Sequence, residues 1–210
     1  MGSVSPPLHI LCFGASITGG HYQFGLAFHP YSRRLRQRLQ QSFPSSEPSI
    51  HVNALPGDYV LNGKYMARLR PQLARDTPRP YDWIIVQGGG NDLIVGAKPG
   101  QVFDALKKIW RTALDSGAKV LALTVTETSD RSDQTSARYK ALNDLIIGHQ
   151  EENFYVADVC SAIPWPKEKA EVHKIWDDGL HFTPFGYDML GDAIANKLVQ
   201  SSSSLPLAKM

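Results

Sequence analysis

The sequence of 210 residues predicts a three-layer α/β/α fold, in which a five-stranded parallel sheet lies between two layers of helices. Short apolar runs alternate with helical patterns five times along the chain, and each apolar run ends at a glycine or a polar turn. Strands joined in this way need right-handed crossovers, which place the strands in parallel and cover both faces of the sheet with helices.

The expected strands are short apolar runs bounded by turn residues. The first is Leu-His-Ile-Leu-Cys-Phe, which ends at Gly14, and the third is Trp-Ile-Ile-Val, which runs into Gly88. The full set covers residues 8–13, 49–55, 83–86, 119–125 and 154–159. Five such strands in one sheet predict a flavodoxin-like arrangement.

The expected helices show apolar residues at helical spacing, such as Leu35 and Leu39 among arginines and glutamines. Pro71 should end or kink the second helix, whereas Pro184 suits the first turn of the last one. These helices cover residues 31–43, 60–73, 101–114, 132–149 and 184–199, and a loop is expected over 161–179. We expect a single domain over 1–210, with a core at about 8–199 and a flexible tail at 200–210.

Composition excludes several classes of protein. A formal net charge of +2 favours neither a nucleic-acid-binding protein nor an acidic tail. Arg33, Arg34, Arg36 and Arg38 are expected on a solvated helix face, with a basic docking patch as the alternative. The two cysteines, Cys12 in an apolar run and Cys160 in a loop, indicate no disulfide framework, although one bridge between them stays open.

No apolar stretch approaches the roughly 20 residues that span a bilayer, and residues 1–7 lack the positive charge of a secretory signal. We therefore expect no membrane span and an intracellular, cytoplasmic protein. The final tripeptide, Ala208-Lys209-Met210, is a variant of the Ser-Lys-Leu peroxisomal signal, so import into peroxisomes is a second expectation.

Polar side chains follow the expected strands in glycine-containing turns. These turns are 14–19, 56–58, 88–92 and, after the long loop, 178–183. In open α/β sheets, ligands bind outside the carboxyl ends of the strands. The four turns are therefore expected to meet at one edge of the sheet.

Their residue types fit an acyl-transfer site. A serine hydroxyl such as Ser16 needs a base, which His181 can supply, and Asp178 can fix the tautomer of that imidazole. The oxyanion would need donors, which the backbone N–H groups of Ser16 and Gly57 and the side-chain amide of Asn91 can provide.

Each element also has a plainer interpretation. Gly88 to Gly90 could form a flexible turn or a phosphate cradle, and Thr183 could be the N-cap before Pro184. The other six histidines are expected to be surface or core residues. The joint occurrence of the four turns, in this order and each after a strand, favours the catalytic interpretation.

At this point the residues resemble the SGNH hydrolases, also called the GDSL-type lipases and esterases. Phe-Gly-Ala-Ser-Ile-Thr at 13–18 resembles the first block of that family, which often has Asp where Ala15 stands. Gly57 matches the glycine of the second block, Gly-Gly-Gly-Asn-Asp at 88–92 the third, and Asp-Gly-Leu-His at 178–181 the fifth. The resemblance spans roughly residues 8–199 and includes the stretches 138–143 and 181–187.

The resemblance implies a serine hydrolase that cleaves carboxylic esters, with Ser16, Asp178 and His181 as the catalytic residues. It implies Ser16, Gly57 and Asn91 as the oxyanion hole. The aspartate replaced by Ala15 is not the triad acid, so activity should survive while local hydrogen bonding differs.

No metal or organic cofactor is implied, and the expected partner is a small-molecule ester. Because no large insertion supplies a lid, small or short-acyl substrates are expected. Acyl transfer, lysophospholipase or thioesterase activity, and a non-catalytic flavodoxin-like binding module are the alternatives. The aromatic segment 163–166 and Trp176 are expected either to wall the alcohol side of the site or to cover the core.

Overall fold

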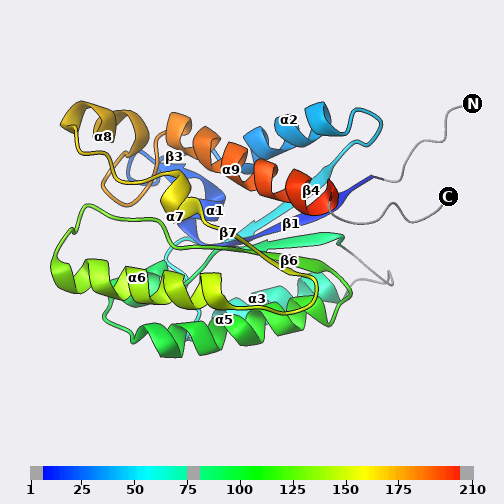
Figure 1. Cartoon of the computed structure of the whole chain (residues 1–210), viewed down its shortest axis with the longest axis horizontal. Helices are drawn as coiled ribbons and strands as arrows, with labels where there is room; N and C mark the ends of the chain where they lie inside the picture. The colour runs from blue at the N-terminus through cyan, green and yellow to red at the C-terminus, as the bar shows by residue number, and fades with distance from the viewer. Residues whose placement is uncertain (1–6, 75–80, 204–210) are drawn as a thin grey trace, which may run out of the picture.

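The computed structural model describes residues 7–74 and 81–203. Its centre is a five-stranded sheet with the order β4-β1-β5-β6-β7, in which every neighbouring pair is parallel. Helices cover both faces (Figure 1). The predicted three-layer α/β/α fold with a five-stranded parallel sheet is therefore confirmed.

The strands lie close to their predicted positions. They are β1 His9–Gly14, β4 Ser49–Ala54, β5 Trp83–Val86, β6 Lys119–Leu123 and β7 Phe154–Ala157. The central strand β5 is buried along its whole length, whereas the edge strand β4 alternates between half-buried and exposed residues over its first four positions. An edge strand has a neighbour on one side alone, which explains the difference.

The long helices pack as two separate layers (Figure 1). One layer contains α2 Ser32–Ser42 and α9 Pro184–Ser203, and the other contains α3 Lys64–Leu73, α5 Pro99–Leu114 and α6 Asp133–Gly148. Pro71 lies inside α3, where it has no backbone N–H to donate to the helix. Because α3 ends within three residues of Pro71, little of the helix is affected.

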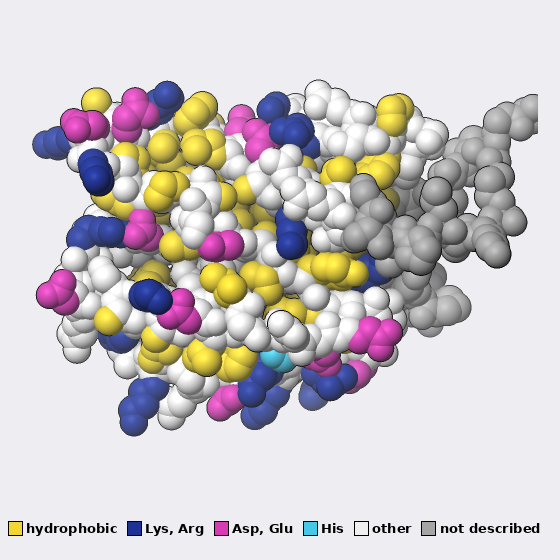
Figure 2. Space-filling model, viewed as in Figure 1, with side chains coloured by type: hydrophobic (Ala, Val, Ile, Leu, Met, Phe, Trp, Pro, Cys, Tyr) yellow, Lys and Arg dark blue, Asp and Glu magenta, His cyan; other side chains and the backbone are white. Residues whose placement is uncertain are grey.

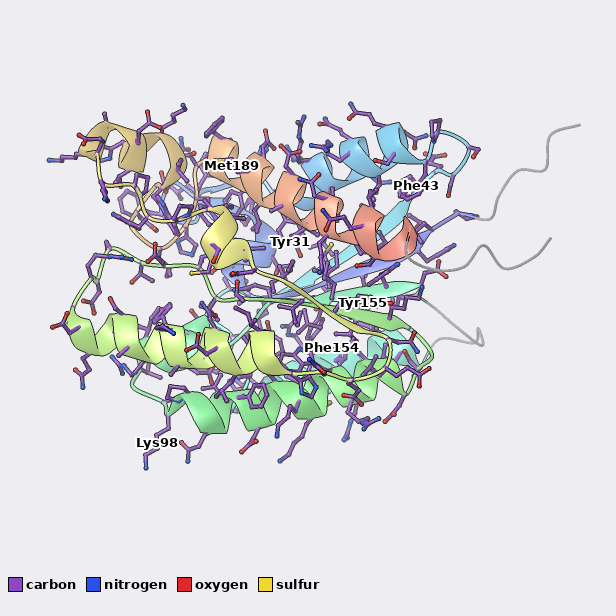
Figure 3. All side chains as sticks on the ribbon, in the orientation of Figure 1. Tyr31, Phe43, Lys98, Phe154, Tyr155 and Met189 are labelled. Carbon is purple, nitrogen blue, oxygen red and sulfur yellow. The ribbon has the colours of Figure 1, made fainter. Side chains whose placement is uncertain are left out.

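The two faces of the sheet give two apolar cores. Successive residues of a strand point to opposite faces, so Phe154 joins the core beneath α5 and α6 while Tyr155 packs against the core beneath α2 and α9. Figure 3 labels both side chains on β7. Ile10 and Cys12 likewise face one core, and Leu11 the other.

Several short elements were not predicted from the sequence. They are α1 Ser16–Gly19, β2 His21–Tyr22, β3 Ala27–Phe28, α4 Gly90–Ile94, α7 Val159–Ala162 and α8 Lys169–Ile175. Most of them are too short to show a periodic pattern. The expectation of a plain loop over 161–179 is thus wrong for 161–162, which lie in α7, and for 169–175, where α8 places Ile175 in an apolar core.

The last helix continues to Ser203, four residues beyond its predicted end, and Ser201 is buried. The expectation of a flexible tail is therefore wrong for residues 200–203. Residues 204–210, including the tripeptide Ala208-Lys209-Met210, lie outside the described residues.

The arginine-rich face of α2 joins two helices together. Arg34 and Arg38 both bind Asp192 of α9 at 2.8 Å, and Arg36 donates to the carbonyl of Pro48. The prediction of a solvated face is wrong for Arg34 and Arg38, which are half-buried because Asp192 of α9 binds both, and it is confirmed for Arg33 and Arg36, which are exposed. Cys12 is buried, Cys160 lies at α7, and both are free thiols.

Within the described ranges 7–74 and 81–203, no helix combines the length and apolar character that crossing a bilayer requires.

Candidate active site

The four predicted turns do meet at the carboxyl edge of the sheet. Ser16 begins α1 directly after β1, and Asn91 lies on α4 after β5. His181 belongs to the turn that precedes α9, and its ring reaches across to Ser16. Residues far apart in the sequence are thus brought to one place by the parallel sheet.

Ser16, His181 and Asp178 form a hydrogen-bonded chain. The Ser16 Oγ lies 2.9 Å from His181 Nε2, and His181 Nδ1 lies 2.7 Å from Asp178 Oδ2. Ser16 is buried, while the side chains of His181 and Asp178 are about one-fifth exposed, at 19% and 20%. The imidazole can therefore take a proton from Ser16 on one side while the carboxylate holds its other nitrogen.

The ionised form of Asp178 is favoured by its hydrogen bonds. Burial alone would raise the pKa of Asp178, but donation from the His181 ring and from the backbone N–H groups of His181 and Leu180 lowers it below its usual value. Those two N–H groups lie 2.7 Å and 3.0 Å from Asp178 Oδ1. The carboxylate thus stays charged where an imidazolium would need it.

Gly179 allows this turn to lie against a neighbouring segment. Its φ of +83° is in the left-handed region, and a Cβ there would lie 2.5 Å from Ser129 Oγ. The carbonyl of Gly179 accepts a hydrogen bond of 2.7 Å from the Ser129 N–H. A side chain at position 179 would therefore displace the turn that carries Asp178 and His181.

Thr183 is the N-cap of α9, as predicted: its hydroxyl accepts the Gly186 N–H at 3.3 Å. The same hydroxyl donates to the carbonyl of Lys174 at 2.6 Å, which joins the start of α9 to the end of α8. The turn carrying His181 is therefore fixed from both sides.

Two of the three candidate oxyanion donors, Ser16 and Asn91, line one small cavity. Asn91 Nδ2 donates one hydrogen to the carbonyl of Asp58 at 2.9 Å, which leaves its second amide hydrogen for a ligand. Ser16 is the first residue of α1, where a backbone N–H has no partner within the helix. Gly57 has a φ of +70° and does not line the cavity beside Ser16, whereas the next residue, Asp58, does.

Asp92 orders the segment that follows Gly57. Its carboxylate accepts the backbone N–H groups of Val60 and Leu61, both at 3.1 Å. Burial raises the pKa of Asp92, and these two hydrogen bonds oppose that effect. The sequence motif identified Asn91, but the structural role of the next residue was not predicted.

Arg68 is a further residue that sequence reasoning missed. Its guanidinium donates to the Gly14 carbonyl at 2.9 Å, to Asp58 Oδ2 at 3.0 Å, and to both the carbonyl and the side-chain oxygen of Asn53. It also lies 4.6 Å from the centre of the Phe13 ring. Arg68 therefore joins the ends of β1 and β4 to the turn after Gly57. Nothing in the sequence distinguishes it from Arg70 on the same helix.

A small cavity of about 20 Å³ lies beside Ser16. Its wall includes Asn91, Tyr139 and the glycines at 88–90. Gly89 has a φ of +98°, and a Cβ there would lie 2.8 Å from Val102 and 3.1 Å from Leu142. The glycine run is thus a closely packed turn under the cavity, in contrast to the flexible turn that was one alternative.

His21 was expected to be a surface or core residue, but it lies next to the site. Its ring centre is 6.4 Å from that of His181. Burial, and then the charge of His181, lower the pKa of His21. His29, which binds Asp188, and His149, which stacks on Trp110, fit the original expectation.

The aromatic segment covers the core. Trp176 is 1% exposed and packs against Phe182 and Trp165, with ring centres 4.3 Å and 4.9 Å away. Of the two alternatives for Trp176, the structure favours the core.

Known proteins resemble this chain in sequence and in fold. The sequence model of the GDSL-like lipase/acylhydrolase family matches residues 12–189. An arylesterase from Vibrio mimicus is 25% identical over 175 residues, which cover 77% of this chain and 80% of that protein.

Solved structures share the fold at lower identity. An α/β hydrolase from the metagenome of Lake Arreo, Spain, superposes with a TM-score of 0.69 at 18% identity, covering 98% of this chain and all of that one. The lipase/acylhydrolase from Enterococcus faecalis gives a TM-score of 0.66 at 18% identity, with coverage of 92% and 96%. Because the family model matches most of the sequence, the chain belongs to the GDSL-like lipase/acylhydrolase family and is an enzyme of the esterase/acylhydrolase type.

Proposed function

We propose that the enzyme hydrolyses carboxylic esters of short acyl groups through an acyl-enzyme formed on Ser16. The observation that carries this proposal is the hydrogen-bonded chain from Ser16 Oγ through the His181 ring to Asp178. Such a chain turns a weakly nucleophilic hydroxyl into a nucleophile.

In the first step, Ser16 Oγ forms a bond to the ester carbonyl carbon while its proton moves to His181 Nε2. The tetrahedral intermediate then breaks its carbon–oxygen bond to the alcohol, and His181 returns the proton to the leaving oxygen. In the second step, a water molecule attacks the acyl-enzyme, with His181 again as base, and Ser16 leaves with its proton restored.

The oxyanion of each intermediate would accept hydrogen bonds from the backbone N–H groups of Ser16 and Gly57 and from the free amide hydrogen of Asn91. The position of Asn91 is supported by its hydrogen bond to the Asp58 carbonyl, which fixes its amide plane at the cavity wall.

The size of the cavity supports a short acyl group. At about 20 Å³ it has room for a group close to the size of one water molecule, which suits the methyl of an acetyl group. Tight packing beneath Gly88 and Gly89 leaves little space for a longer chain to enter.

The test is a panel of p-nitrophenyl esters of increasing acyl length, assayed with the wild type and with Ser16→Ala. We expect the highest kcat/KM for the acetate and a steady decrease with chain length. Ser16→Ala should lose turnover and also lose covalent labelling by a fluorophosphonate probe, while circular dichroism shows an intact fold.

Stoichiometric labelling of Ser16→Ala would refute the assignment of the nucleophile. A kcat/KM that rises with acyl length would refute the short-acyl proposal and favour lysophospholipase or thioesterase activity. Adding a second alcohol to the same assay measures the ratio of transfer to hydrolysis, and predominant transfer would make the enzyme an acyltransferase.

A further inference from the structure

The wall of the cavity beside Ser16 includes two buried polar side chains. Tyr139 of α6 is 6% exposed, and Gln87, directly after β5, is 7% exposed. Both residues line the cavity. Among residues 7–74 and 81–203, neither the Tyr139 hydroxyl nor Gln87 Oε1 has a hydrogen-bond partner. Buried polar groups in folded proteins are almost always paired, so these two atoms point to a ligand that pairs with them.

The backbone around both side chains is fixed by hydrogen bonds. The Gln87 N–H donates to the Phe13 carbonyl at 3.0 Å, which holds the end of β5 against β1. One turn along α6 from Tyr139, Asn143 accepts from the Val125 N–H at 2.7 Å and donates to the Val125 carbonyl at 2.8 Å. Val125 lines the cavity as well. The wall is therefore in place before a ligand arrives, which lowers the cost of binding.

The cavity wall differs from the outer surface in its charge. Figure 2 shows Lys, Arg, Asp and Glu side chains spread over one face of the molecule. Of the described residues that line the cavity, Asp58 alone has a carboxylate, and Arg68 binds it at 3.0 Å. Burial raises the pKa of Tyr139 to about 12, so its hydroxyl stays neutral. Because burying an unpaired charge costs far more than burying a neutral polar group, the wall favours a neutral ligand.

A hydroxyl group on the ligand matches both unpaired atoms. The Tyr139 hydroxyl can donate one hydrogen bond and accept another, and the side-chain amide of Gln87 has an acceptor oxygen and a donor nitrogen. A ligand hydroxyl also donates and accepts, so it can pair with Tyr139 and with either end of the Gln87 amide. At about 20 Å³ the cavity has room for one group close to the size of a water molecule, which is also the size of a hydroxyl group.

This hydroxyl has to lie close to the reacting carbon of the ester, because Ser16 lines the same small cavity. In an ester of a 2-hydroxy acid, a single carbon separates the hydroxyl from the carbonyl carbon that Ser16 attacks. Glycolyl is the smallest acyl group of this kind. A propionyl group has the same number of non-hydrogen atoms, but it would offer no partner to Tyr139 or Gln87.

We propose that the acyl subsite takes a 2-hydroxyacyl group such as glycolyl, and that the Tyr139 hydroxyl and the Gln87 side chain bind the hydroxyl of this group. The acyl group is transferred to Ser16 and then to water by the steps given above, and its own hydroxyl takes no part in breaking or forming bonds. This inference rests on the proposed function, because it names the short acyl group that the same site prefers.

The test compares ethyl glycolate with ethyl propionate, which share their alcohol and differ in one atom of the acyl group. The measured quantity is the ratio of kcat/KM for the glycolate to that for the propionate, divided by the ratio of their rates of hydrolysis by hydroxide. This division corrects for the greater reactivity of the glycolate carbonyl. We expect a corrected ratio of about ten or more for the wild type, because a site that pairs a substrate hydroxyl rejects an analogue without it.

Two variants each remove one partner of the hydroxyl. Tyr139→Phe deletes one oxygen, and Gln87→Met replaces the amide by a side chain of similar size whose sulfur is a weak acceptor. We expect each to lower the corrected ratio roughly five- to tenfold, the effect of one lost hydrogen bond. Tyr155→Phe on β7 and Gln101→Met on α5 are the matched controls, because neither residue lines the cavity, and both should keep the wild-type ratio.

A corrected ratio near one in the wild type would overturn the inference, and so would a wild-type ratio in either Tyr139→Phe or Gln87→Met, with the fold checked by circular dichroism. A wild type that prefers ethyl glycinate with its amine charged would also overturn it, because the cavity would then take a cation. These outcomes leave the proposed function intact as long as the wild type cleaves p-nitrophenyl acetate and Ser16→Ala does not. Loss of that difference would instead refute the proposed function itself.

Discussion

The two halves of the candidate site are held in place by different means. The proton-transfer half, Asp178 and His181, belongs to one short turn in which the carboxylate binds both the ring and two nearby backbone N–H groups. The oxyanion half is assembled from the ends of three strands. There, Asn91 binds the Asp58 carbonyl, and Arg68 joins Gly14, Asn53 and Asp58.

Because of this difference, the two halves should respond to different kinds of substitution. A local turn keeps its geometry when distant residues change, so its function depends on the few atoms that carry charge and protons. An assembly of distant segments depends on its cross-links, and substitutions away from the reacting atoms should also weaken it.

The largest loss of activity is expected from a substitution in the proton-transfer half. Asp178→Asn should lower kcat for p-nitrophenyl acetate on the order of 10⁴-fold, because an amide no longer fixes the reactive tautomer of His181 or stabilises its charged form. The backbone N–H groups of the turn can still donate to the amide oxygen, so the melting temperature should change little.

Asp177→Asn is the control, since the Asp177 carboxylate accepts from the Gln23 N–H at 2.6 Å, on the same turn but outside the hydrogen-bonded chain of Ser16, His181 and Asp178. Its effect on kcat should be far smaller. A loss below tenfold in Asp178→Asn would mean that Asp178 does not orient His181 during turnover.

An intermediate loss of activity is expected when a candidate donor of the oxyanion half is removed. Asn91→Ala should lower kcat by roughly 10²–10³ with little change in KM, because the amide donates to charge that develops in the transition state. Steady-state kinetics on p-nitrophenyl acetate measures both constants.

The same substitution at Asn62, an exposed loop residue whose side chain accepts from the Lys64 N–H, separates a catalytic from a structural effect. Asn62→Ala should affect thermal stability more than kcat. Near-normal turnover in Asn91→Ala would remove Asn91 from the oxyanion hole.

The smallest loss of activity is expected at Arg68, whose hydrogen bonds join the segments of the oxyanion half. This substitution tests most directly whether the two halves differ. Arg68→Lys keeps a positive charge but cannot reach three segments at once, so we expect a loss in kcat of roughly tenfold, about 1.4 kcal/mol, with KM nearly constant. Arg70→Lys, on the same helix but exposed, should match the wild type.

If Arg68→Lys lowers the melting temperature but not kcat measured well below it, Arg68 stabilises the fold without positioning the oxyanion half. The activity of the oxyanion half would then not depend on the hydrogen bonds that join its distant segments.

Sequence reasoning succeeded where chemistry is local. The strands were predictable from apolar runs, and Asp178 and His181 from a spacing of three residues that any turn can bring together. Arg68 and Tyr139 could not be found in this way, because each lies on a regular helix whose sequence pattern does not reveal the atoms it faces. His21 was missed since it lies on a two-residue strand.

The sequence by itself determined the fold class, the family and the identity of the residues that meet at the carboxyl edge of the sheet. The apolar runs that form the strands, and the motifs that follow them, are local patterns that can be read directly from the sequence. The single domain over 1–210 stays a prediction. Only the tertiary structure decided which hydrogen bonds hold the oxyanion half together, how small the cavity beside Ser16 is, and that Tyr139 lines this cavity. These features depend on side chains from separate segments packing together, and no local pattern in the sequence specifies such contacts.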